Sequence, residues 1–137
     1  SLHEGSGGAG QYRGGFGINY RVRLRRGQAR ASFVMDHGRT GPLGARGGHD
    51  GGCNRVLIRQ HRNGTIHDYD PPHRSKDQDI DVEPGDEIWV STPGGGGYGN
   101  PGLRPGEKLR EDLARGYYSR EQLVAAYPQA KEALDEA

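Results

Sequence analysis

The glycines of this chain are gathered in three segments, and this feature constrains the fold more than any other. Of 25 glycines in 137 residues, 20 lie within residues 5–17, 38–52 and 94–102. They do not recur at every third position, which excludes a collagen triple helix. Because glycine has no side chain, such segments can approach one another closely or adopt positive φ, and can pack as extended polyproline II-like chains. The clustering therefore favours close backbone packing over low-complexity disorder.

Ordered strand patterns lie between the glycine segments. Tyr20, Val22 and Leu24 alternate with arginines, which is the period of a half-buried strand. A second strand is expected at 29–35, and the short turn at Arg26-Gly27 predicts that the two form a β-hairpin.

The middle of the chain carries a second hairpin signal. Residues 55–59 are a short apolar run, and the Asn63-Gly64 dipeptide predicts a two-residue turn to a strand at 65–69. Alternation around Ile80 and Val82, and the run at 87–92, predict further strands. The sequence therefore predicts roughly six short strands.

The last third of the chain is helical in pattern. Leu109 and Leu113 predict a short amphipathic helix over 106–114 that ends at Gly116. Ser119 and Gln122 have capping-box spacing for a second helix, and a third is expected at 129–136. We predict one domain over 1–137, mainly β with polyproline II-like glycine segments at 5–102 and a helical tail at 103–137.

Composition argues against a membrane protein, a secreted protein and a nucleic-acid-binding protein. Only 31% of residues are hydrophobic, no apolar run is long enough to cross a membrane, and the first residues do not resemble a secretory signal. The single cysteine, Cys53, favours a reducing compartment, so we expect a cytoplasmic protein with no membrane partner. Residues 1–62 carry 11 arginines against 3 acidic residues and the remainder is acidic, so neither sign dominates enough to predict a nucleic-acid partner. The arginine row 21, 23 and 25 favours a solvated sheet face or an acidic partner.

Few residues are candidates for a metal-binding, phosphate-binding or catalytic site. His37, His49 and Cys53 lie near one glycine segment and are the candidate metal ligands, although no zinc-type spacing such as CxxC or HxxxH is present. The Gly94–Gly99 loop lacks the GxxxxGK[ST] pattern, and no helix begins directly after it, so a phosphate loop is not supported. Cys53 has no nucleophile pattern around it. We therefore predict no catalytic and no cofactor-binding residue.

Three motifs resemble one known family. GGAGQYRGGFG at 7–17, the Gly- and Pro-rich stretch 41–52, and PGD at 84–86 leading to TPGGGGYGNP at 92–101 are similar to the C-terminal part of the hydantoinase B / 5-oxoprolinase / acetone carboxylase α-subunit family. The last motif is the most specific, and it differs from the family pattern at Asn100, where aspartate is usual. Members of the family are far longer, so the chain resembles only their final portion.

The resemblance implies a subunit of a larger enzyme. Within the family the chain resembles most the small subunit of the multi-subunit acetophenone carboxylases, ligases that act on an aromatic ketone, bicarbonate and ATP. The implied partners are hydantoinase A-like subunits that bind ATP and divalent metal, and a large hydantoinase B-like subunit whose fold this chain would complete. The residues expected to serve subunit packing are Gly14, Gly15, Gly94, Gly95, Gly96, Gly97 and Tyr98.

Two alternatives stay open. The chain could belong to an ATP-dependent hydantoinase or oxoprolinase that hydrolyses a cyclic amide, because nothing in these residues chooses between carboxylation and hydrolysis. It could instead be a free-standing binding module that uses its basic N-terminal half, in which case binding to nucleic acid would depend on salt.

Overall fold

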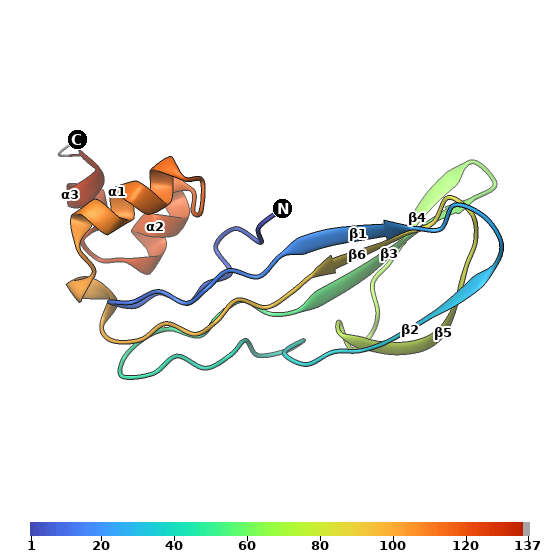
Figure 1. Cartoon of the computed structure of the whole chain (residues 1–137), viewed down its shortest axis with the longest axis horizontal. Coiled ribbons are helices and arrows are strands. Elements are labelled where there is room, and N and C mark those ends of the chain that lie inside the picture. The colour runs from blue at the N-terminus through green and yellow to red at the C-terminus, as the bar shows by residue number, and fades with distance from the viewer. Residues whose placement is uncertain (136–137) are drawn as a thin grey trace.

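The computed structural model describes residues 1–135 and arranges them in three parts (Figure 1). Six strands lie at one end, the glycine-rich segments run through the middle as extended chain, and three short helices lie at the other end. This confirms a mainly β fold with short C-terminal helices.

Four of the strands form one antiparallel sheet in the order β1-β6-β3-β4. Their bounds are β1 (Asn19–Arg23), β6 (Glu87–Ser91), β3 (Arg55–Arg62) and β4 (Thr65–Tyr69). The hairpin β3–β4 is confirmed, since Asn63 and Gly64 have φ of 49° and 77°, the double positive φ of a type I′ turn.

The other two strands form a separate antiparallel ribbon, and here the prediction from sequence is wrong. β2 (Ala29–Val34) does not pair with β1 but with β5 (Lys76–Val82), while β1 pairs with β6. The chain between β1 and β2 crosses to a second layer, with Gly27 at φ 78°. In that layer the apolar face of β2 can cover the sheet, which a flat hairpin within the sheet would not allow.

The first core lies between the sheet and the ribbon. Val56 and Ile58 of β3 are fully buried and pack with Val90 of β6 and Phe33 of β2. These side chains come from both layers, so the core depends on β2 lying opposite the sheet.

The helices follow the predicted pattern closely. A short 3₁₀ turn η1 (Pro101–Leu103) precedes α1 (Gly106–Ala114), and α2 (Arg120–Ala126) and α3 (Ala130–Asp135) follow. The capping box of Ser119 and Gln122 is present, and Gly116, just past α1, has φ 67°. Of the expected third helix, position 136 lies outside the described residues.

The second core lies where the helices meet the glycine-rich segments. Leu109, Leu123, Tyr127 and Ala130 are almost completely buried, and Ala9 from the first glycine segment belongs to the same cluster. The helices therefore pack on the glycine-rich segments rather than on the sheet (Figure 1). None of the helices within residues 1–135 has the length and apolar character needed to cross a membrane.

Candidate functional site

The family-like motifs meet in a layer of three extended segments, residues 5–17, 41–52 and 93–99, which we call the glycine layer. Each segment is hydrogen-bonded to the other two: Gly8 N donates to Gly95 O at 2.8 Å, Gly97 N to His49 O at 2.8 Å, and His49 N to Ala9 O at 2.7 Å. The layer is therefore held by backbone groups, with few side chains between the segments.

Close approach explains why glycine is needed in this layer. A Cβ added to Gly14 would lie 1.9 Å from the carbonyl oxygen of Gly95, and one added to Gly97 would lie 2.1 Å from that of Ala9. Both separations are far below van der Waals contact, so no side chain fits. The same holds across the layer for Gly8, Gly41, Gly44, Gly48, Gly51, Gly94 and Gly96.

Not all of the predicted packing residues are used in this way. Gly14, Gly94, Gly96 and Gly97 pack against other segments of the same chain. A Cβ on Gly15 would meet no described atom within 4 Å, and one on Gly95 would come no closer than 3.3 Å. The packing that demands glycine is thus internal to the chain, and packing of these residues against another subunit stays a prediction.

Tyr98 differs from the glycines around it, because its side chain faces outward. It is half exposed, pairs through its backbone with Tyr12, and the two rings lie 6.4 Å apart between centroids. Two exposed tyrosines thus stand side by side on the surface of the glycine layer.

Four of the six amide groups of the Gly94–Gly99 loop are already occupied, those of Gly95, Gly97, Tyr98 and Gly99. Gly95 N donates to Gly15 O at 2.8 Å, Gly97 N to His49 O at 2.8 Å, and Tyr98 N to Tyr12 O at 2.8 Å. A phosphate loop needs such amides free to point at the ligand. Most of the loop's amides are therefore used in packing within the chain.

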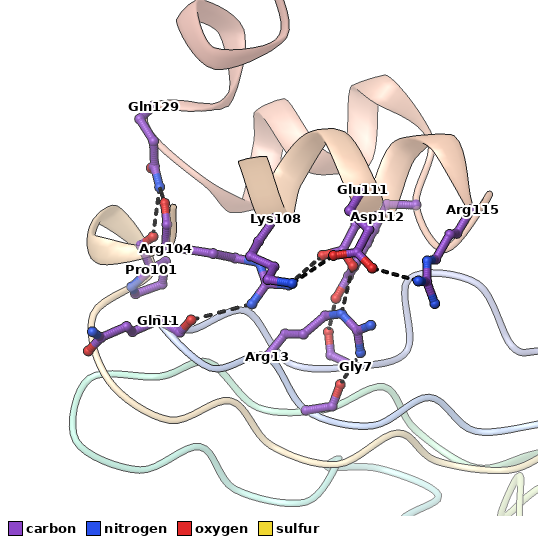
Figure 2. Close-up of polar contacts among 12 residues, drawn as sticks. Gly7, Gln11, Arg13, Pro101, Arg104, Lys108, Glu111, Asp112, Arg115 and Gln129 are labelled. Atoms are coloured by element: carbon purple, nitrogen blue, oxygen red, sulfur yellow. Dashed lines mark hydrogen bonds and ion pairs between the residues drawn. The ribbon is translucent and has the colours of Figure 1, made fainter. Parts of the chain in front are cut away.

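A buried ion cluster joins the helices to the glycine layer (Figure 2). Asp112 on α1 is almost fully buried and accepts hydrogen bonds from Arg104 Nη2 at 2.7 Å and from Arg13 Nε at 3.1 Å. Arg104 also donates to the carbonyl oxygen of Gln11, and Gln129 Nε2 donates to the carbonyl oxygen of Arg104 at 2.9 Å. One carboxylate is thus shared by two guanidinium groups from different parts of the chain.

Aromatic side chains contact the arginines of this cluster. The guanidinium carbon of Arg13 lies 4.5 Å from the ring centre of Phe16 and 5.1 Å from that of Tyr117, as in cation–π contacts. Tyr118 donates to the carbonyl oxygen of Gly7 at 2.7 Å, and burial raises the pKa of its phenol. The Arg13–Tyr117 and Tyr118–Gly7 contacts tie the first glycine segment to the turn between α1 and α2.

A second buried carboxylate belongs to the PGD motif. Asp86 is fully buried and accepts hydrogen bonds from Arg62 Nη1 at 2.6 Å, from His61 N at 2.8 Å and from Glu83 N at 2.9 Å. Burial by itself would raise the pKa of Asp86, but these hydrogen bonds to the ionised form outweigh it and hold the pKa below its ordinary value. The motif therefore secures the turn before β6 to the end of β3.

The three candidate metal ligands are not brought together. His37 lies in a hollow with His73, His49 in another beside α2, and Cys53 in a third near His3. Within residues 1–135, no group of three or more His, Cys, Asp or Glu side chains has an arrangement that could hold a metal ion. His37, His49 and Cys53, grouped because they share one glycine-rich stretch, thus do not form one metal site among residues 1–135.

The family model of hydantoinase B/oxoprolinase matches residues 1–101, which include all three motifs. The chain belongs to this family. The 5-oxoprolinase of Saccharomyces cerevisiae is 35% identical over 99 residues, which are 72% of this chain and 7% of the yeast protein. Caprolactamase subunit beta of Pseudomonas jessenii is 31% identical over 122 residues, 87% of this chain and 20% of that subunit.

Two solved structures share the fold of this chain. The ATP-dependent caprolactamase from Pseudomonas jessenii superimposes with a TM-score of 0.69 at 25% identity, covering 89% of this chain and 21% of that one. A nucleotide-free acetone carboxylase also gives 0.69, at 17% identity, covering 93% and 20%, which shows likeness of fold alone. The chain thus spans about a fifth or less of the length of these relatives.

Sequence reasoning missed the ion cluster of Arg13, Arg104 and Asp112. One signal was present, because Asp112 lies three positions after Leu109 and so falls on the buried face of α1. A carboxylate on an apolar helix face requires buried partners. The partners themselves could not be found, since Arg13 lies 99 positions away.

Proposed function

We propose that this chain is a structural, non-catalytic part of an ATP-dependent enzyme complex of the hydantoinase B/oxoprolinase family. The observation that carries the proposal is the internal use of the family motifs. The glycines of the first and last motifs pack backbone against backbone, and Asp86 of the PGD motif holds a turn. These residues build a fold, because their contacts lie within the chain.

The proposed partners of this chain are other subunits in the cytoplasm. One is a large hydantoinase B-like subunit, since this chain matches 20% of the length of caprolactamase subunit beta. Hydantoinase A-like subunits would bind ATP and a divalent metal, since four of the six amides of the Gly94–Gly99 loop are engaged within the chain.

Two reactions are candidates for the complex. Carboxylation of an aromatic ketone with bicarbonate, as in an acetophenone carboxylase, is the reaction that the family resemblance implies, and the chain shares its fold with an acetone carboxylase. Hydrolysis of a cyclic amide is supported by the higher identities to the 5-oxoprolinase and the caprolactamase subunit. Both reactions consume ATP to activate a carbonyl compound, so they differ in the co-substrate rather than in the role of this chain.

The test is purification of the native complex through a tag on the full chain, from the organism that encodes it. We expect co-purification of hydantoinase A-like and B-like subunits, and ATP hydrolysis that depends on substrate. Stimulation by acetophenone only with bicarbonate would select the carboxylase, and stimulation by 5-oxoproline or caprolactam without bicarbonate would select the hydrolase. Recovery of the chain alone, without these subunits and without ATP hydrolysis, would contradict the proposal.

A further inference from the structure

A hollow of about 580 Å³ lies between α2 and the turn at residues 45–48 of the glycine layer. The turn, η1 and α2 all lie at the same end of the molecule, away from the sheets (Figure 1). Sites for small organic ligands commonly have volumes of about 300–1,000 Å³. The hollow is therefore large enough for such a ligand.

The lining of this hollow has an apolar part and a basic part. Val124 and Ala126 of α2, with Pro101 of η1, form the apolar part, and Arg46 and His49 form the basic part. Among residues 1–135, no acidic side chain lines the hollow, and Arg46 forms no ion pair. A guanidinium group without a carboxylate partner, beside an apolar surface, favours a ligand that has both a negative charge and an apolar body.

Two other hollows with basic residues differ in this respect. The one that contains His37 also contains Asp36, which pairs with Lys76 at 3.6 Å. The one that contains Cys53 also contains Glu4. An acid in the lining offsets the positive charge, so the hollow beside α2 is the best site for an anion among these three.

The backbone at Arg46 also favours a role for its side chain. Gly48 N donates to Ala45 O at 2.9 Å, and φ is 53° at Arg46 and 89° at Gly47, as in a type I′ turn. The first central position of such a turn favours asparagine, aspartate or glycine, because most other residues are strained at positive φ. Arginine at this position costs stability, and binding through its guanidinium group gives a physical reason for its presence.

The donors around the hollow select the kind of anion. The N–H groups of Gly48, His49 and Gly102 donate to acceptors within the chain at 2.9, 2.7 and 2.8 Å. Phosphate sites collect several free backbone N–H groups, whereas a guanidinium group alone can meet a carboxylate with two parallel hydrogen bonds. One arginine and one imidazole therefore match a carboxylate better than a phosphate.

We propose that this hollow binds a small organic carboxylate. The carboxylate group accepts hydrogen bonds from the Arg46 guanidinium and the His49 imidazole, and the apolar body of the ligand lies against α2 and Pro101. Val124, whose side chain is 42% exposed in the unliganded chain, is covered by the ligand. The site is separate from the buried ion pairs of Asp112 and Asp86, because none of its lining residues contributes to them.

Both reactions proposed for the complex form a compound of this class. Carboxylation of an aromatic ketone gives a keto acid, and opening of a cyclic amide by water gives an amino acid, so each product has a carboxylate on a carbon skeleton. The source of the ligand thus rests on the proposed function, whereas the class of ligand rests on the lining of the hollow.

The test follows the methyl groups of Val124 by NMR. The full chain is labelled at its valine methyls and studied in the assembly with which it purifies. The probes are benzoate, benzamide as its uncharged analogue, and inorganic phosphate as an anion without an apolar body. A saturable shift of the Val124 methyl signals with benzoate is expected, with binding of benzamide and phosphate at least about tenfold weaker.

A variant of the turn tests the role of the arginine. Arg46→Asn removes the guanidinium group and places a residue that the turn favours, so the fold should be kept while benzoate binding weakens about tenfold or more. Arg74→Asn is the matched control, because Arg74 also has positive φ, 48°, and lines the hollow that contains Cys53 instead. This variant should bind benzoate as the unmodified chain does.

Three outcomes would overturn the carboxylate site. They are the absence of a saturable Val124 shift with benzoate, equal binding of benzoate and either benzamide or phosphate, and equal benzoate affinity of Arg46→Asn and Arg74→Asn. None of them bears on the proposed function, which depends on co-purification with the other subunits and on ATP hydrolysis.

Discussion

At the scale of single residues, the close packing of the glycine layer depends on whether a Cβ would fit at each glycine position. Neighbouring glycines have opposite surroundings, as Gly14 and Gly15 demonstrate. A Cβ on Gly14 would overlap the carbonyl of Gly95, whereas one on Gly15 would point into open space. Two adjacent glycines of one motif therefore have different reasons for being there.

This contrast predicts different effects of alanine. Gly14→Ala is expected to destabilise the chain by about 3 kcal/mol, because the segments 5–17 and 93–99 must move apart. Gly15→Ala should be close to neutral, within about 0.5 kcal/mol. The measurement is the urea concentration at which the chain leaves the purified complex. Similar midpoints for the two variants would contradict the steric account.

At the scale of elements, α1 is attached to the glycine layer by a charge rather than by apolar side chains alone. Asp112 has a side chain that is 4% exposed and it pairs with two arginines, one of which, Arg104, is 8% exposed. Burying charges is unfavourable unless each is paired. The geometry of the attachment is therefore specific, because the carboxylate must meet both guanidinium groups at once.

Two neighbouring residues of α1 test this attachment. Asp112→Ala leaves Arg104 buried without its partner and is expected to cost about 3 kcal/mol. Glu111→Ala is the control, since Glu111 pairs with Lys108 and Arg115 at the exposed surface and should have little measurable effect. Limited proteolysis of the complex would report release of residues 106–135. Equal cleavage of both variants would show that the buried cluster does not hold the helices.

At the scale of the whole molecule, two small cores are separated by a layer that contains few side chains. The core of Val56 and Ile58 lies between sheet and ribbon, and the core of Leu109 and Leu123 lies under the helices. Only 31% of the residues are hydrophobic, and exposed apolar side chains line the edge of β1. A chain of this kind buries less apolar surface than a typical domain of its length.

The consequence is that the fold should depend on the partner. We predict that the isolated chain unfolds without a cooperative thermal transition and gives a poorly dispersed amide spectrum. Addition of the large hydantoinase B-like subunit should protect the backbone amides of the chain from exchange with solvent. The measurements are circular dichroism against temperature and a two-dimensional NMR spectrum of the lone chain. A single cooperative transition with a dispersed spectrum would contradict this prediction.

The sequence by itself determined the local structure and the family. The Asn63-Gly64 turn, the capping box of Ser119 and Gln122, and the glycine segments were all readable, because each depends on residues close in the chain. The tertiary structure decided which strands pair, so that β1 lies beside β6 and β2 lies in a second layer. It also brought Arg13 and Arg104 to Asp112. These contacts arise from burying surfaces that are distant in sequence, and local patterns do not encode the partner of a strand or of a charge.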